Sequence, residues 1–145
     1  MRRGLSLGDL GDLFDLPLAA VISLGRPDGT VFSRPVWHRW EDGRFMIQIP
    51  AGDRKILMLE RDDRLTVVLS ENEFPYRGIE VRGRARLRHD RYHERGLEIC
   101  RRYVEAYDSE ADVDAYLSIE PGVIVEVQAD TTNCWDYADD DLMPA

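Results

Sequence analysis

Residues 48–59 read Gln48-Ile49-Pro50-Ala51-Gly52-Asp53-Arg54-Lys55-Ile56-Leu57-Met58-Leu59, and the rest of the chain is interpreted outward from this stretch. Residues 44–49 predict a strand and residues 53–60 a short helix, with Asp53 as N-cap because its carboxylate can accept hydrogen bonds from first-turn N–H groups. Arg54 and Lys55 lie in that first turn, at the positive end of the helix dipole, so the stretch predicts a phosphate-binding site. Lys55 is the single lysine among 19 Lys and Arg residues. A second interpretation stays open, in which the low lysine content reflects coding bias and both cations only face solvent.

The composition fits one domain of 145 residues, long enough to bury one sizeable core. A formal net charge of −9 argues against nucleic acid or an anionic membrane as the main partner. No apolar run reaches the roughly 18 residues needed to span a bilayer. Acidic residues follow the start too soon for a secretory signal, so a cytoplasmic protein is expected. Cys100 and Cys134 stand apart without nearby His, which predicts neither a disulfide framework nor a zinc site.

Apolar runs and alternation predict six strands with short helices between them. The predicted strands are residues 18–24, 30–40, 44–49, 64–70, 78–88 and 123–129. The predicted helices are residues 6–15, 53–60, 92–107 and 112–117, and an acidic tail begins at about residue 136. The first three strands are expected to form a meander, and the arginines of residues 78–88 a solvated row. This pattern favours a small antiparallel barrel over a parallel sheet.

The common catalytic motifs are absent from the sequence. There is no G-x-G-x-x-G after a strand, and no G-x-x-x-x-G-K-[ST], H-E-x-x-H or G-x-S-x-G. His38 is expected to be a packed or rim residue, while His89 and His93 are expected to be exposed. We therefore assign no catalytic residue and no metal ligand. The remaining interpretation is a protein that positions a cofactor, with the cofactor carrying the reaction.

Three segments carry a family resemblance through their order and spacing. They are residues 33–37 (Ser-Arg-Pro-Val-Trp), residues 53–65 with Asp-Arg-Lys at their start, and residues 75–85 (Pro-Tyr-Arg-Gly-Ile-Glu-Val-Arg-Gly-Arg-Ala). Over about residues 18–129 the chain resembles the pyridoxamine-5′-phosphate-oxidase-like FMN-binding split barrels, in particular their small deazaflavin (F420)-dependent branch. The resemblance implies a mainly β fold, a six-stranded antiparallel split β-barrel with short flanking helices, as a single domain over residues 1–145.

The resemblance also implies a homodimer with two cofactor sites at its interface. Arg54 and Lys55 would grip the cofactor phosphate. The ring and ribityl chain would contact Ser33, Arg34, Pro35, Val36, Trp37, Ile49, Pro50 and Ala51. Tyr76 and Arg77 would come from the partner subunit or the rim. Two positions depart from the family. Met58 stands where the family usually has Asn, and Pro50 stands where Ser or Thr is common, so the resemblance does not fix the individual ring contacts.

The function implied by the resemblance is hydride transfer between F420 and a small unsaturated substrate, which needs no acid or base from the protein. One alternative is an FMN-binding reductase or oxidase on the same barrel. Others are a non-enzymatic flavin- or haem-binding protein and a structural relative without cofactor. F420 and FMN both present a phosphate to the same turn, so both stay open. True pyridoxamine-phosphate oxidases are longer and end in an Arg- and His-containing phosphate motif, so that activity is not expected.

A homodimer is also favoured by aromatic residues of the sequence. Trp37, Trp40 and Tyr76 are expected to gather near one rim of the barrel. Aromatic side chains are enriched at the centres of protein interfaces.

Overall fold

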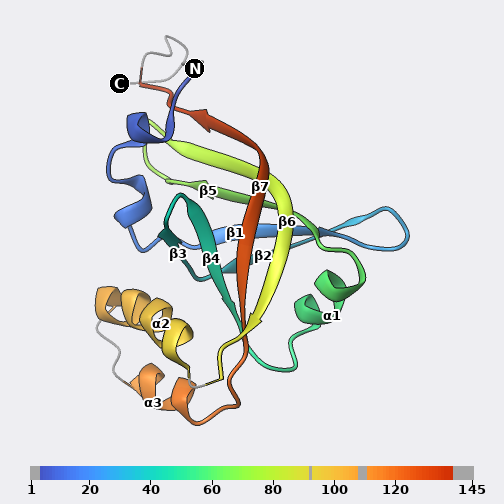
Figure 1. Ribbon diagram of the computed structural model, residues 1–145. Coiled ribbons are helices and arrows are strands. Elements are labelled where there is room, and N and C mark those ends of the chain that lie inside the picture. The colour runs from blue at the N-terminus through green and yellow to red at the C-terminus, as the bar shows by residue number, and fades with distance from the viewer. Residues whose placement is uncertain (1–3, 92, 108–110, 139–145) are drawn as a thin grey trace.

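The computed structural model describes residues 4–91, 93–107 and 111–138, and the predicted acidic tail from residue 139 onward lies outside the described residues (Figure 1). Seven strands form one antiparallel sheet in the order β2-β1-β5-β6-β7-β4-β3. Their bounds are β1 Ala20–Gly25, β2 Val31–Val36, β3 His38–Glu41, β4 Arg44–Ile49, β5 Arg64–Ser70, β6 Gly78–His89 and β7 Val123–Trp135. Since β2 and β3 end the sheet on opposite sides yet follow each other in the chain, the sheet curls into a half-barrel. The expected mainly β barrel is thereby confirmed, with one strand more than predicted.

The inner face of the curled sheet holds the main hydrophobic core. Side chains alternate along β4 and β5, where every second residue is buried and the intervening ones are half-buried or exposed. Large core side chains include Phe45, Ile47, Ile49, Leu65, Val67, Leu69, Ile79 and Val81. A smaller cluster of Ile99, Tyr103 and Ile124 packs helix α2 (Glu94–Tyr107) onto the outside of the sheet.

The predicted helix over residues 6–15 is wrong. Two short 3₁₀ turns occupy this segment, Leu7–Leu10 and Leu13–Asp15. Gly11 separates them with a φ of 59°, a left-handed backbone conformation that ends a regular helix. The apolar residues that suggested a helix instead pack into the barrel core, where Leu10 and Leu13 are fully buried.

The predicted strand over residues 30–40 is two strands that pair at opposite ends of the sheet. In β2, Val36 pairs with Ala20 of β1, whereas His38 of β3 pairs with Ile47 of β4. Trp37 lies between them, and its carbonyl accepts a hydrogen bond from the N–H of Gln48. The expected three-strand meander is therefore wrong. The β1–β2 and β3–β4 pairs are instead two hairpins that the Trp37 corner joins across the opening of the barrel.

The last strand extends beyond its predicted end at residue 129. β7 runs to Trp135 and pairs with β6 along its whole length, with an irregularity opposite Arg82 and Gly83. A Cβ on Gly83 would lie 1.9 Å from the carbonyl oxygen of Gln128, so this close approach of the two strands requires glycine. Residues 130–133 are polar and exposed, so the apolar pattern that predicted the strand stops before them.

The helices lie outside the barrel. α1 spans Arg54–Arg61, and α2 (Glu94–Tyr107) and α3 (Ala111–Leu117) lie together on another side of the sheet in Figure 1. The expected exposure of His93 is wrong, because the residue is 8% exposed and its Nε2 lies 3.0 Å from the carbonyl oxygen of Ile119. His89 is exposed as predicted. Among the described residues, no helix has the length and apolar character to cross a membrane.

The arginine row of β6 faces outward, as the alternation predicts. The side chains of Arg82 and Arg84 are 66% and 58% exposed and pair with Glu80 and Asp63. We expect Arg84→Gln and Arg86→Gln to change the free energy of unfolding by less than about 1 kcal/mol, because exposed ion pairs contribute little. Urea denaturation of each variant measures this. A loss of several kcal/mol would mean that these side chains are buried in an assembly of the protein.

The three aromatic residues expected near one rim make different contacts. Trp37 stacks on Tyr103, and Trp40 stacks on Phe14. Tyr76 instead packs edge-on against Phe74 and Tyr137. They do not form one aromatic cluster in the described chain, so this argument for a dimer interface is not supported.

Candidate functional site

The candidate site begins where β4 ends and α1 starts. The chain turns at residues 50–52, where Gly52 has a φ of 79° and Asp53 N–H donates to the carbonyl of Pro50. Asp53 then caps α1 as predicted, with its Oδ1 accepting a 2.9 Å hydrogen bond from the backbone N–H of Lys55. This local geometry fixes the directions of Arg54 and Lys55 at the start of the helix.

A hollow of about 460 Å³ opens beside this helix start. It is lined by Phe32, Arg34, Pro35, Asp53, Arg54 and Lys55. Three cations and one carboxylate thus surround it. Within the described part of the chain, Lys55 pairs with Asp53 at 3.0 Å, while no carboxylate pairs with Arg34 or Arg54. The hollow therefore has the charge needed to bind an anion.

A second hollow of about 320 Å³ adjoins the first. Its lining residues are Ala19, Pro35, Val36, Trp37, Gln48, Pro50, Asp53 and Lys55, of which Pro35, Asp53 and Lys55 also line the first hollow. Most of this lining is apolar or aromatic. The side-chain Nε2 of Gln48 is buried and has no hydrogen-bond partner in the described structure. Because buried amide N–H groups are rarely left unpaired, Gln48 is suited to donate to a bound ligand.

Trp37 forms an aromatic wall of the second hollow and is held from behind by α2. Its ring stacks on Tyr103 with centroids 4.9 Å apart and planes within 4°. Tyr103 is 1% exposed, and its hydroxyl donates to the carbonyl of Leu18 at 2.8 Å. The same hydroxyl accepts from the backbone N–H of His38 at 3.0 Å. The orientation of Trp37 thus depends on a buried residue 66 positions later in the chain.

Arg102 ties the same region together from the neighbouring position on α2. Its guanidinium donates to the carbonyl of His38 at 2.8 Å and to the carbonyls of Phe14 and Leu16 at 2.6 and 2.7 Å. These three acceptors belong to β3 and to the N-terminal segment. The helix therefore anchors both segments that flank the second hollow.

His38 is packed in the core, as predicted, with its Nδ1 2.9 Å from the hydroxyl of Tyr103. Burial, and next the positive charge of Arg102, lower the pKa of His38 from 6.5 to about 3. The folded protein keeps this imidazole neutral, whereas the unfolded chain takes up a proton below about pH 6.5. Stability from this group is therefore present at neutral pH and is lost as the pH falls toward 3.

We expect His38 to make the free energy of unfolding fall by about 2 kcal/mol between pH 7 and pH 5, since one pKa unit corresponds to about 1.4 kcal/mol. Urea denaturation over this interval measures the slope. His38→Gln should have a flatter profile, although its stability at pH 7 will be lower. His89→Gln, at an exposed histidine, controls for loss of a histidine as such. Parallel profiles for wild type and His38→Gln would contradict the assignment.

Seven of the twelve residues predicted to contact a cofactor line the two hollows: Arg34, Pro35, Val36, Trp37, Pro50, Arg54 and Lys55. The other five, Ser33, Ile49, Ala51, Tyr76 and Arg77, do not. Ser33 bonds through its hydroxyl to Ser23 on β1 at 2.8 Å. Ile49 was expected to contact the cofactor ring, but its side chain is fully buried in the core and lines neither hollow.

Arg77 is held by residues of its own chain. Its guanidinium makes two hydrogen bonds with the carboxylate of Glu71 and one with Asp12, and it also donates to the carbonyl of Leu10. The hydrogen bonds to Glu71, and next those to Asp12, raise the pKa of Arg77. This side chain therefore links the loop before β6 to the N-terminal segment and has little capacity for a ligand.

The sequence reasoning missed Ala19, Phe32 and Gln48 as lining residues, and it treated Asp53 only as a helix cap. Gln48 carried a usable signal, because it is the polar residue of an otherwise apolar strand end next to the turn predicted to bind phosphate. Ala19 and Phe32 carried none, since small and apolar residues are ordinary in strands.

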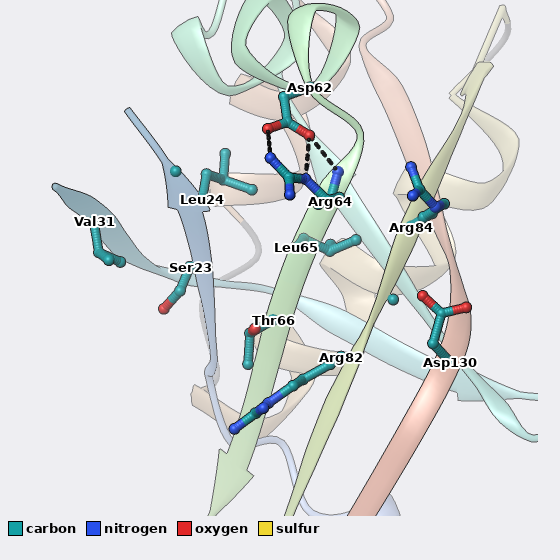
Figure 2. A pocket seen from close by; sticks show the side chains of 12 residues that line it. Ser23, Leu24, Val31, Asp62, Arg64, Leu65, Thr66, Arg82, Arg84 and Asp130 are labelled. Atoms are coloured by element: carbon teal, nitrogen blue, oxygen red, sulfur yellow. Dashed lines mark hydrogen bonds and ion pairs between the residues drawn. The ribbon is translucent and has the colours of Figure 1, made fainter. Parts of the chain in front are cut away.

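A third hollow of about 370 Å³ lies on the outer surface between β1, β5, β6 and β7 (Figure 2). Most of its charges are in ion pairs, but Arg82 and Arg84 pair with Glu80 and Asp63, which do not line it. Arg64 holds the carboxylate of Asp62 through its guanidinium and backbone N–H, and these hydrogen bonds lower the pKa of Asp62 to about 2. Figure 2 shows this pair at one end of the hollow, with Arg82, Arg84 and Asp130 along β6 and β7. None of the residues predicted to bind a cofactor lines it.

The two adjoining hollows contain no set of groups for metal or nucleophilic catalysis. Neither His nor Cys lines them, and Asp53 is the one carboxylate in their linings. Over the described residues, no group of three or more His, Cys, Asp or Glu side chains is arranged to hold a metal ion. What the site offers is a cationic end and an aromatic, apolar end that contains one unpaired amide donor.

Comparison with solved structures finds the same fold. The conserved hypothetical protein Rv2991 from Mycobacterium tuberculosis matches with a TM-score of 0.75 and 22% identity over 99% of this chain and 91% of that one. An F420 reductase matches with a TM-score of 0.67 and 22% identity over 83% and 93%. A protein of the pyridoxinephosphate oxidase family from Clostridium acetobutylicum, related to general stress protein 26, matches at 0.67 and 13% over 90% and 88%.

No protein-family model matches the chain, and no curated protein does either. The structural likeness extends over nearly the whole of each protein compared, at identities that establish fold only. It agrees with the three sequence segments that carried the resemblance. The chain therefore has the split-barrel fold of the pyridoxamine-phosphate-oxidase-like proteins.

Proposed function

We propose that this protein binds F420 in the two adjoining hollows and passes a hydride between the cofactor and a small unsaturated substrate. One observation carries the proposal: a cationic hollow next to an aromatic one, with the buried, unpartnered amide of Gln48 in the second. An isolated anion would need only the first hollow. A ring system on a phosphate-bearing chain fits both.

The chain's own residues would hold the cofactor by its two ends. Arg54 and Lys55 would bind the phosphate, with Arg34 as a third cation. Trp37 would cover one side of the ring, and Gln48 would donate to a polar ring atom. When bound, the cofactor supplies the hydride chemistry, and the hollows add binding, orientation and shielding from water.

Asp53 is not a suitable general acid or base for this reaction. It is the carboxylate in the lining, and both its oxygens are occupied by Lys55. The proposal therefore assigns the protein no proton-transfer step. This agrees with a reaction in which a hydride moves directly between ring and substrate.

F420 is favoured over FMN because an F420 reductase shares the fold over 83% of this chain. The alternative is that the barrel binds FMN as a reductase or oxidase, since FMN has a similar ring and phosphate. We also propose a cytoplasmic location.

We further propose a homodimer in which Tyr76 contributes to the partner's site. It is supported by the side chain of Phe74, which is 39% exposed and packs edge-on against Tyr76, where a partner would cover it. Because Arg77 is tied to Glu71 and Asp12, Tyr76 is the better candidate of the pair. Sedimentation should give twice the chain mass, and a monomer at micromolar concentration would remove the shared site.

Titration of the purified protein with F420 and with FMN tests the cofactor. F420 absorbs in one near-ultraviolet or visible band and FMN in two, so the bound species is identified directly. We expect saturable binding of F420, followed by its oxidation or reduction with a panel of small enone-type substrates. Binding of FMN alone would support the alternative function, and binding of neither would remove the proposal. Bound F420 without any turnover would indicate a carrier.

A further inference from the structure

Asp53 lines both hollows and interacts with Lys55 in two ways. One carboxylate oxygen accepts from the Lys55 backbone N–H at 2.9 Å, and the other lies 3.0 Å from the Lys55 ammonium nitrogen. The side chain of Asp53 is 24% exposed and that of Lys55 is 12% exposed, so solvent screens this ion pair less than a surface pair. A negative charge is thus built into the part of the site that attracts anions.

This carboxylate affects different phosphates differently. Any anion that reaches Lys55 gains from the cations of the first hollow but is repelled by Asp53, in proportion to its own charge. A phosphate monoester, as in FMN, carries about 1.5 to 2 negative charges at pH 7 because its second pKa is near 6. A phosphodiester, such as the one in F420, carries a single negative charge. The repulsion is therefore larger for the monoester.

We propose that Asp53 is a specificity-determining residue that shifts the binding preference from phosphate monoesters toward cofactors whose phosphate is a singly charged phosphodiester. The inference rests on the proposed function, because it assigns the phosphate to the hollow beside Lys55. Besides capping the helix, Asp53 reduces the advantage that the three cations of the first hollow give to a doubly charged phosphate. F420 is the phosphodiester that fits the ring-binding hollow, and FMN is the competing monoester.

The two roles of Asp53 can be separated by substitution. Asn and Ser are about as good as Asp at the N-cap position, since each offers an oxygen to the first-turn N–H groups. Asp53→Asn and Asp53→Ser should therefore keep α1 in place while removing the negative charge. Asp62→Asn is a matched control, because Asp62 caps the other end of the same helix but pairs with Arg64 and lines neither of the two adjoining hollows.

Equilibrium titrations with F420, FMN and riboflavin test the proposal. In both Asp53 variants we expect the affinity for FMN, relative to that for F420, to rise about three- to tenfold over wild type. Riboflavin has no phosphate, so its affinity should stay unchanged, and Asp62→Asn should behave as wild type. Thermal melting of each variant checks that the fold is retained.

Three results would overturn the proposal. Equal gains for F420 and FMN would mean that Asp53 does not sense ligand charge. A similar gain for riboflavin would place the effect in ring packing. Binding of neither phosphate-bearing cofactor to the wild type would remove the proposed function and this inference together, whereas an unchanged ratio in proteins that do bind would remove the inference alone.

Discussion

Lys55→Ala is expected to weaken cofactor binding about 10- to 150-fold, because a hydrogen bond to a charged group contributes roughly 1.5–3 kcal/mol. The Lys55 side chain lies at the junction of the two hollows and is only 12% exposed. Its removal also leaves Asp53 without its cation, next to the incoming phosphate. Arg54→Ala should act similarly, with some loss of orientation because arginine can bind phosphate through two N–H groups.

Titration of F420 and FMN into wild type and Lys55→Ala measures the effect. The difference should shrink as salt is added, since ions screen partly exposed charges. Arg82→Ala is the control, because Arg82 is a cation on the outer surface that pairs with Glu80 and lines neither cofactor hollow. Equal affinity of wild type and Lys55→Ala for whichever cofactor binds would rule out the phosphate role. The single lysine would then be a matter of composition.

A double substitution sharpens this test. If Lys55 and Asp53 act on the phosphate as a pair, Lys55→Ala should cost less in an Asp53→Asn background than in wild type. The difference between the two costs is the coupling energy between the residues. Additive effects would mean that the ion pair seen between them plays no part in phosphate binding.

The parts of the fold that depend on residues close together in the sequence could be predicted from it. The strand at residues 64–70 matches β5 at both ends, and the cap and start of α1 were predicted because Asp53 acts on the residues just after it. The strand over residues 30–40 could not be divided correctly. Its residues stay extended throughout, and what changes at Trp37 is the partner strand, which no local pattern records.

The same division holds for the site. Most residues that line the two hollows lie in two short segments, residues 34–37 and 50–55, so family resemblance and spacing were sufficient to find most of them. The support behind Trp37 could not be predicted. It comes from Tyr103 and Arg102 on α2, where an apolar helical stripe suggested only ordinary core packing. The helical stripe shows which residues of α2 are buried, but not that the Tyr103 ring stacks on Trp37, because that contact joins residues far apart in the chain.

Tyr103→Ala is expected to lower the free energy of unfolding by about 3–5 kcal/mol, as for other large buried aromatic residues. The ring fills the space between α2 and the sheet, and the hydroxyl bonds Leu18 and His38 in a region closed to solvent. Tyr103→Phe keeps the ring and removes the hydroxyl, so we expect a loss of about 1–3 kcal/mol from the groups left unpaired. Urea denaturation measures both values.

Cofactor binding separates the two contributions of this residue. Tyr103→Phe retains the ring that stacks on Trp37, so its affinity for the cofactor should stay within about threefold of wild type, a change of less than 1 kcal/mol. Tyr76→Phe is the matched control for stability, because the Tyr76 hydroxyl makes no hydrogen bond within the described residues, and this substitution should cost less than about 0.5 kcal/mol. If Tyr103→Phe and Tyr76→Phe cost the same, the buried hydroxyl does not stabilise the corner at Trp37. A large loss of affinity in a stable Tyr103→Phe protein would instead show that the hydroxyl, through His38 and Leu18, sets the position of the aromatic wall.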